Sequence, residues 1–374
     1  MDYAVLIVGS GPAGASTALH LARDYPHLAA QSLILEKARH PRPKLCGGGV
    51  TPVAYTVLRG LGLMPRGLSY APVRQAHLHF RDRCFVVRGA PLFRVYRREQ
   101  FDAWLADQVR RQGIPLHEEE PFLGLEREED HLLVHTPRTT YRVRVLVGAD
   151  GANSRVRQAL GLRGEPSRLA RLLEVLTPVD PERTPAFTQK AAFLDWSVMV
   201  RGIQGYVWDF PVWVDGRAYL NRGIFDSRVI PSAPRGRLRA AFEEALAHRG
   251  IALEEVRLMG HPLRWFDRRA TLARPHVLLV GDAAGVDPLL GEGIGWSLAY
   301  GRVAAEAIGA AFEKGNFRFA DYSQRLMADG LGRSLQRRTF FARLGYRLRQ
   351  PWLLLPLWRG LGVLATWALR WDWG

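Results

Sequence analysis

A glycine-rich turn directly behind the first apolar run places the strongest constraint on how this chain can fold. Residues 4–8 are apolar and rich in β-branched side chains, which favours a strand buried on both faces of a parallel sheet. The turn that follows contains Gly9, Gly11, Pro12, Ala13 and Gly14. A helical pattern starts within it, so backbone N–H groups and a helix N-terminus would face the same point. The spacing predicts a strand–turn–helix unit that binds a phosphate-containing ligand.

The next apolar run indicates what kind of ligand this is. Residues 32–35 predict a second strand, which ends in Glu36 and Lys37. Glu36 lies 22 residues after Gly14, where an acid can accept hydrogen bonds from a ribose. We therefore expect a dinucleotide on a Rossmann-like sheet.

Two later apolar runs also end in a carboxylate beside a glycine. They cover 143–150 and 277–282, and their ends carry Asp150, Gly151, Gly281 and Asp282. A helix is expected over about 294–314, and its N-terminus favours negative charge nearby.

Together these segments resemble the FAD-dependent oxidoreductases of the aromatic hydroxylase type. The resemblance implies that Arg98 contacts FAD and that Asp282 binds its ribityl chain. It further implies that the segment 288–295 lines the flavin ring, with Pro288, Gly291, Gly293 and Ile294 as contact residues.

Two further segments resemble the geranylgeranyl reductase family over about residues 3–315. The first is the run Cys46, Gly47, Gly48 and Gly49, whose first three residues would lie at the flavin. The second is the alternating aromatic set Tyr206, Trp208 and Phe210, followed by Pro211. The sequence departs from the family at Val212 and Trp213, where a glycine is usual.

The resemblance implies an enzyme that saturates double bonds of a geranylgeranyl chain, carried on a lipid, a diphosphate, a quinone or a pigment precursor. Reduced FAD would supply a hydride, and Cys46 is the candidate catalytic residue. As a proton donor Cys46 must stay a thiol, whereas Lys44 and Arg42 nearby would favour the thiolate. NADPH or a reduced ferredoxin would deliver the electrons.

The aromatic set predicts the floor of the substrate channel, because alternate residues of a strand share one face. An ordinary sheet core is the competing interpretation. Two other functions share the FAD motifs: a monooxygenase or halogenase, and a non-catalytic flavoprotein or lipid-binding module.

The expected fold class is α/β, with a Rossmann-like FAD-binding domain, an inserted antiparallel β-sheet substrate domain and a C-terminal helical tail. The FAD-binding domain would comprise 1–72, 96–165 and 270–312. The substrate domain would comprise 73–95 and 166–269, and the tail 313–374.

Charge and cysteine content limit the partners. The net charge of +16 favours anionic partners, among them an anionic membrane surface, and no recognition motif points to nucleic acid. Two cysteines and no secretion signal lead us to expect a cytoplasmic protein. His77 and His79 alternate on a predicted strand, but the sequence offers no third ligand, so no metal is expected.

The end of the chain is both basic and apolar. Residues 331–374 contain eight arginines and five tryptophans, and the segment 351–369 carries one charge. Phe340, Phe341 and Leu344 would share one helical face, with Arg338 opposite. A peripheral membrane anchor on the inner face of the membrane is the favoured interpretation. Packing on the FAD-binding domain and a membrane span are the alternatives.

Overall fold

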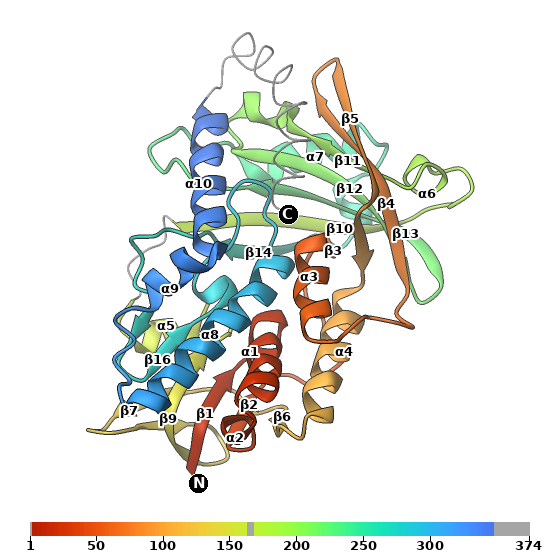
Figure 1. Ribbon diagram of the computed structural model, residues 1–374. Coiled ribbons are helices and arrows are strands. Elements are labelled where there is room, and N and C mark those ends of the chain that lie inside the picture. Colours follow the sequence, from red (N-terminus) through yellow and green to blue (C-terminus); the bar gives the residue numbers. More distant parts are fainter. Residues whose placement is uncertain (1, 163–167, 348–374) are drawn as a thin grey trace.

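Two β-sheets, joined by helices, form the molecule. The computed structural model describes residues 2–162 and 168–347. The first sheet and its helices occupy the lower half of Figure 1, and the second sheet the upper half. The expected segment 351–369 lies outside the described residues.

The first sheet is the Rossmann-like one. Its strands are β1 (Asp2–Val8), β2 (Ser32–Leu35), β6 (Leu116–His117), β7 (Gly124–Arg127), β8 (Leu132–His135), β9 (Thr140–Gly148), β15 (Ala273–Arg274) and β16 (Val277–Leu279). They run in the order β15-β16-β9-β1-β2-β6, with β7 and β8 attached beside β9. The pairs from β16 to β6 are parallel, and the interior strands are almost wholly apolar, as both faces are covered.

Parallel register brings the ends of four strands to one edge. Val8 pairs with Leu35 on one side and with Gly148 on the other, and Gly148 pairs with Leu279. The turns that follow β1, β2, β9 and β16 therefore lie side by side at the carboxyl edge. In open α/β sheets, this is the edge at which ligands bind.

The helices mostly cover the first sheet. They are α1 (Pro12–Asp24), α2 (Pro26–Ala29), α3 (Pro52–Gly60), α4 (Arg98–Arg111), α5 (Arg155–Ala159), α6 (Pro185–Thr188), α7 (Leu238–Ala247), α8 (Ile294–Lys314), α9 (Tyr322–Asp329) and α10 (Leu331–Arg347), with short 3-10 turns at Trp196–Arg201, Leu253–Glu255 and Gly281–Ala283. Helices α1 and α8 pack side by side (Figure 1). Their contact is close: a Cβ on Gly301 would lie 2.3 Å from Ser16 Oγ, which itself donates to the Leu298 carbonyl at 2.6 Å.

The second sheet is antiparallel except for one pair. Its strands are β3 (Gly49–Val50), β4 (Tyr70–Phe80), β5 (Arg83–Tyr96), β10 (Leu169–Pro178), β11 (Ala191–Asp195), β12 (Gly205–Val214), β13 (Arg217–Asp226) and β14 (Met259–Arg264). Their order is β14-β10-β13-β12-β11-β4-β5-β3, and β11 pairs with β4 in parallel. Helix α7 packs on one face of this sheet, through a separate apolar cluster that includes Val175 and Ile224.

The expected α/β fold class is confirmed, including the second, mainly antiparallel sheet and the helical C-terminal region. Two strands depart from the expected division of the chain. Strand β3 and the start of β4, at Tyr70, lie within residues 1–72, yet both pair with β5 in the second sheet. The chain therefore enters the second sheet before residue 73.

Helix α10 has the expected arrangement, with Phe340 and Phe341 on one side and Arg338 on the other. Phe340 and Phe341 are exposed, at 62% and 46%, whereas Arg338 turns inward and bonds to Asp287 at 3.0 Å. The arginine finds a buried carboxylate there, which a helical periodicity alone does not reveal. Among the described residues, no helix is long and apolar enough to cross a membrane.

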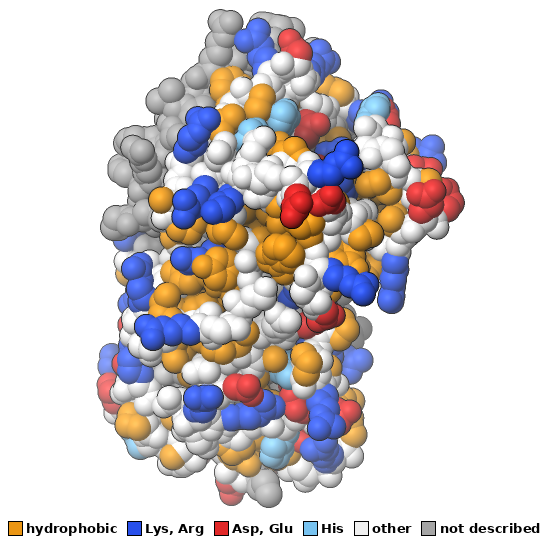
Figure 2. All heavy atoms as spheres, turned by 90° about the vertical axis from the view of Figure 1, so that its right-hand side faces the viewer, with side chains coloured by type: hydrophobic (Ala, Val, Ile, Leu, Met, Phe, Trp, Pro, Cys, Tyr) orange, Lys and Arg blue, Asp and Glu red, His pale blue; other side chains and the backbone are white. Residues whose placement is uncertain are grey.

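Basic side chains are spread over the face shown in Figure 2, and apolar side chains gather in its middle third. The net positive charge is thus not confined to one patch on this face. It suits attraction of anionic partners to a broad surface.

The α1–α8 contact gives a test of the packing. Gly301→Ala should destabilise the protein by about 1–3 kcal/mol, because the added methyl group overlaps Ser16. Gly345→Ala in α10 is the matched control, since nothing lies within 4 Å of its Cβ position. That variant should gain about 0.5–1 kcal/mol from helix propensity. Urea and thermal unfolding midpoints measure both, and equal shifts of one sign would contradict the packing argument.

Candidate functional site

The glycine turn after β1 forms a tight cradle. Gly9 has φ of 102°, and a Cβ there would lie 2.5 Å from the Ala149 carbonyl oxygen. A Cβ on Gly14 would lie 1.9 Å from the Gly9 carbonyl oxygen. Gly11 differs, because its backbone is extended and the nearest atom to its Cβ position is Arg42 Nη2, at 3.7 Å. Gly9 and Gly14 are needed for the turn itself, and Gly11 keeps the space in front of it open.

Glu36 lies buried at the end of β2, beside this turn. Its Oε2 accepts hydrogen bonds from the Ser10 amide at 3.1 Å and the Ser10 hydroxyl at 2.7 Å, and pairs with Arg42 at 3.2 Å. Burial raises the pKa of Glu36, but Arg42 and Ser10 outweigh it and hold this pKa below its ordinary value. The carboxylate is therefore charged and already oriented toward the turn. Lys37, by contrast, is exposed.

Arg98 is buried at the start of α4. Its guanidinium bonds to both oxygens of Asp102, at 2.8 and 2.9 Å, and also donates a hydrogen bond to Cys46. Arg42 joins the pair from the other side, with Nη1 3.5 Å from Asp102 Oδ2. The two arginines thus share one buried carboxylate between the Glu36 turn and Cys46.

Asp282 follows β16 in the 3-10 turn at Gly281–Ala283. Burial raises the pKa of Asp282, and the charges of Lys44 and Arg98 oppose that rise. Lys44 Nζ lies 3.1 Å from His261 Nε2. Burial and the charge of Lys44 lower the pKa of His261 to about 3, so this ring is neutral and can accept a hydrogen bond from the ammonium group. Gly281 has φ of 58°, and its Cβ position lies 2.6 Å from Ala13, so the two turns are in contact.

Asp150 and Gly151 lie at the same edge, after β9. Asp150 Oδ2 accepts a hydrogen bond from the Val156 amide, 3.1 Å away, at the start of α5. Burial raises the pKa of this carboxyl group. Gly151 has φ of 81° with nothing within 4 Å of its Cβ position. Asp150 therefore fixes the start of α5, and Gly151 leaves backbone uncovered.

The loop before α8 is held by Asp287. Its carboxylate accepts hydrogen bonds from the Leu289 amide at 2.7 Å and the Leu290 amide at 3.1 Å, and Arg338 pairs with it. Asp287 therefore orders the backbone of this loop. The segment thus positioned includes Pro288, Gly291, Gly293 and Ile294.

The N-termini of α1 and α8 both point into this edge without a side-chain cap. Gly11 and Gly293 are their N-cap residues, and neither can offer a side-chain oxygen to the first N–H groups. Gly293 lies close to Asp282, whose Oδ1 is 3.6 Å from its Cβ position. Uncapped helix starts that pack side by side supply N–H donors and positive potential to an anionic ligand.

The aromatic residues of β12 line one face of the second sheet. Tyr206 and Trp208 are buried, and their ring centroids are 6.3 Å apart; Phe210 continues the row at 6.2 Å from Trp208. A Cβ on Gly47 would lie 3.2 Å from the Phe210 ring. The turn after Cys46 therefore lies directly on the aromatic face.

Asn221 ties Cys46 to this face. Its Oδ1 accepts from Trp208 Nε1 at 2.8 Å, and its Nδ2 donates to the Cys46 carbonyl oxygen at 3.2 Å. The Cys46 sulfur accepts hydrogen bonds from the Gly48 amide, at 3.4 Å, and from Arg98. Both of these neighbours are hydrogen-bond donors to the sulfur.

Glu174 is a candidate site residue that no sequence pattern indicated. It lies buried on β10, in register with Gly223, which in turn is in register with Trp208. Burial raises the pKa of Glu174 to about 7, although hydrogen bonds from the Cys46 backbone and the Asn221 side chain partly offset this. An acid that titrates near neutrality beside a candidate site is suited to proton transfer. Only the register of β10 brings it there, and no local motif marks it.

The residues at this edge fit a bound FAD. The glycine cradle leaves room for a pyrophosphate, two uncapped helix starts face it, and Glu36 is oriented at the turn. Asp282, Arg98 and the Cys46 turn lie between the cradle and the aromatic face. An extended dinucleotide bound along this edge would contact these groups in the same order, from its pyrophosphate to its flavin ring.

The two kinds of glycine separate cofactor binding from folding. Gly11→Val should fold, since its extended backbone accepts valine, but should lose most of its FAD because the side chain fills the open space. Gly9→Val should fail to fold, because of its positive φ and the Ala149 carbonyl. Circular dichroism reports folding, and the absorbance of released flavin reports the FAD content. A Gly11→Val protein with a full complement of FAD would contradict this assignment.

Comparisons with known proteins agree with the geometry. The family model described as an FAD binding domain matches residues 2–300. Digeranylgeranylglycerophospholipid reductase 2 of Methanopyrus kandleri is 30% identical, over 84% of this chain and 78% of its own. Geranylgeranyl diphosphate reductase of Rhodobacter capsulatus is 27% identical, over 84% and 77%. Menaquinone reductase of Mycolicibacterium smegmatis is 26% identical, over 81% and 75%.

Solved structures share the fold. A geranylgeranyl bacteriochlorophyll reductase-like protein from Thermoplasma acidophilum superposes with a TM-score of 0.74 at 21% identity, covering 92% of this chain and 87% of that one. The halogenase PltM, in complex with phloroglucinol and FAD, gives 0.70 at 14% identity, over 98% and 82%. The fold is thus shared by flavoproteins with different activities. The three sequence relatives given above, by contrast, are all named as reductases. The chain belongs to the geranylgeranyl reductase family of FAD-dependent oxidoreductases.

Proposed function

We propose that this oxidoreductase saturates carbon–carbon double bonds of an isoprenoid chain. The observation that carries the proposal is the position of the Cys46 turn. Arg98 contacts Cys46 from the FAD edge, while Gly47 lies on the rings of Trp208 and Phe210. A double bond held on the aromatic face would therefore lie next to the cofactor edge.

The printed names of the relatives support the choice of substrate. One acts on a digeranylgeranylglycerophospholipid, one on geranylgeranyl diphosphate and one on menaquinone. Their head groups differ, and an isoprenoid chain is the part that these substrates share. We therefore infer that the aromatic face binds the isoprenoid chain and that the basic surface binds the head group.

When bound and reduced, FAD would supply a hydride to one carbon of the double bond, and the other carbon must receive a proton. The side chains of Tyr206, Trp208 and Phe210 hold the chain and can stabilise positive charge that develops on it. Glu174 supplies the proton, because its carboxyl group is protonated near neutrality. Cys46 positions the turn, because hydrogen bonds from Gly48, Arg98 and Asn221 hold both its sulfur and its carbonyl oxygen.

The division of labour follows the two sheets. The first sheet with α1 and α8 would be the FAD-binding domain, and the second sheet the substrate domain. Exposed Phe340, Phe341 and Leu344 on α10, together with the net charge of +16, favour contact with an anionic membrane surface that holds the lipid substrate. NADPH or a reduced ferredoxin would act as the transient electron donor.

The decisive experiment is anaerobic. The bound flavin is reduced with dithionite, geranylgeranyl diphosphate or a geranylgeranylated lipid is added, and the products are weighed by mass spectrometry. We expect a gain of about two hydrogens for each saturated bond. Unchanged lipid with a flavin that reoxidises only in air would favour the monooxygenase alternative. A flavin that neither oxygen nor lipid reoxidises would favour a non-catalytic flavoprotein.

The role of Glu174 predicts a pH dependence. Its raised pKa keeps the acid protonated below about pH 7, so the single-turnover rate of lipid saturation should fall as pH rises through that value. Glu174→Gln should lower the rate at pH 6 by roughly 10²–10⁴-fold and remove this dependence. Anaerobic stopped-flow measurements over a pH series test both effects.

Cys46→Ser is the matched comparison, because it alters the same turn without removing the acid. It should retain the fall in rate around pH 7. If the dependence instead survives in Glu174→Gln and disappears in Cys46→Ser, the proton comes from the thiol and the assignment of Glu174 is wrong.

A further inference from the structure

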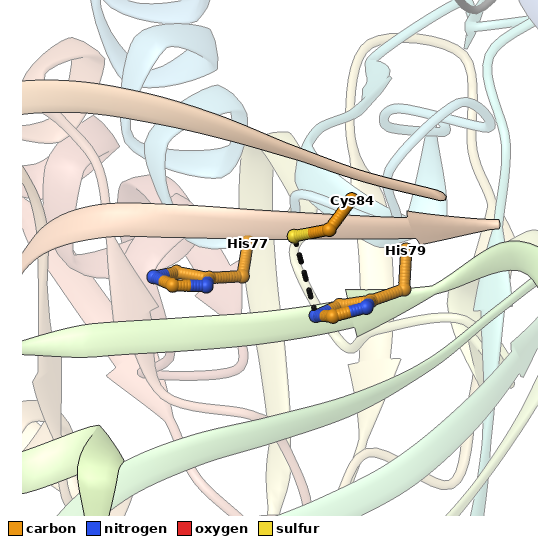
Figure 3. Close-up of side chains that lie close together, drawn as sticks. All are labelled: His77, His79 and Cys84. Atoms are coloured by element: carbon orange, nitrogen blue, oxygen red, sulfur yellow. Dashed lines mark hydrogen bonds between the residues drawn. The ribbon is translucent and has the colours of Figure 1, made fainter. Parts of the chain in front are cut away.

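Two histidines and a cysteine meet on one face of the β4–β5 hairpin. Cys84 on β5 is directly opposite His79 on β4, and His77 lies two residues along β4 on the same face. The Cys84 sulfur is 3.6 Å from His79 Nε2. One ligand atom from each of the three residues lies within 4.8 Å of the others (Figure 3). In the described part of the chain, this is the one group of three or more such side chains close enough to hold a metal ion.

The sequence alone offers no third ligand beside His77 and His79. The third ligand is five residues beyond His79, across a tight turn, and it becomes a neighbour only because β4 and β5 pair with this register. Directly opposed residues of an antiparallel pair have Cβ atoms about 4.5–5.5 Å apart, which is close enough to share an ion.

The rings have a fixed apolar support. Phe193 on β11 is in register with His77, and its ring centroid is 4.8 Å from that of His77 and 6.2 Å from that of His79. His77 Nε2 is buried and has no hydrogen-bond partner. A buried ring nitrogen without a partner is costly, and a ligand would satisfy it.

The donor set indicates the kind of ion. Two imidazoles and a thiolate suit a borderline metal such as Zn²⁺, whereas Ca²⁺ and Mg²⁺ require oxygen ligands. The positive charge of Arg88 acts on His77 and opposes binding of a cation by charge attraction alone. Binding would therefore depend on coordinate bonds from the two imidazoles and the thiolate. Three protein ligands leave the fourth tetrahedral position to a water molecule.

The cluster lies on the face of the second sheet opposite to the aromatic one. His77 is in register with Phe193 and Asp209, whereas Leu78 is in register with Leu194 and Trp208. Since neighbouring residues of a strand point to opposite faces, an ion at His77 cannot contact the face that carries Trp208. The site is therefore separate from the flavin and from the proposed substrate channel.

We propose that His77, His79 and Cys84 bind one zinc ion that clamps the tip of the β4–β5 hairpin. On binding, the thiol loses its proton to solvent, and the sulfur–zinc bond forms without any redox change. The other end of β5 supports the Cys46 turn, because Tyr96 and Phe93 contact Gly48 and Gly49. Clamping the hairpin would thus stabilise the second sheet without taking part in the reaction.

The test uses the full-length holoenzyme with no affinity tag, because a histidine tag would bind zinc itself. Calorimetric titration with Zn²⁺ should show one equivalent bound. Co²⁺ should give the ligand-field absorption bands of a tetrahedral site in the red, at longer wavelengths than the absorption of the oxidised flavin. Cys84→Ser and His77→Ala should each weaken zinc binding at least about tenfold. Zinc should raise the thermal unfolding midpoint of the parent protein but not that of either variant.

Controls separate this site from adventitious binding. His27→Ala removes an exposed histidine elsewhere, and Cys46→Ser removes the other cysteine; both should still bind one equivalent of zinc. The flavin spectrum of each variant shows whether it has folded. The proposal is overturned if the folded parent binds no zinc, or if zinc binding is the same in Cys84→Ser, His77→Ala and the parent.

Discussion

The distance between the cofactor edge of the first sheet and the aromatic face of the second depends on the turn at Gly47 and Gly48, where there is no room for side chains. A Cβ on Gly47 would meet the ring of Phe210, and one on Gly48, whose φ is 74°, would lie 2.3 Å from the Tyr96 carbonyl oxygen. The backbone of this turn can therefore lie flat between the cofactor edge and the aromatic face. A larger residue at either position would force these two surfaces apart.

Buried charge is the second constraint on the site. Arg42, Arg98 and Lys44 are taken out of water at this edge, and each lies near a carboxylate: Glu36, Asp102 and Asp282 respectively. Charges buried in this way are tolerated when they are paired and hydrogen-bonded. At this edge each of these cations therefore has a carboxylate nearby, although the net charge of the chain is strongly positive.

Local patterns predicted the elements that bind the nucleotide, and long-range register determined the rest. The apolar runs and glycines marked β2 and α8 with their observed bounds, because each signal lies within one short segment. Glu174 and Cys84 carry no such signal, since they reach their neighbours only through pairing with other strands. Helical periodicity placed Arg338 opposite Phe340 and Phe341, as observed, but it could not show that this side of α10 packs on Asp287.

The contact between α10 and the loop before α8 links the last described helix to the proposed flavin edge. Arg338 pairs with the same Asp287 carboxylate that orders Leu289 and Leu290, and Tyr346 donates to the Leu289 carbonyl oxygen at 2.6 Å. Shortening the protein from its C-terminus would remove these contacts before it reached the Rossmann-like sheet. A truncated protein that loses its yellow colour would then report a damaged flavin loop, and not a lost attachment to lipid.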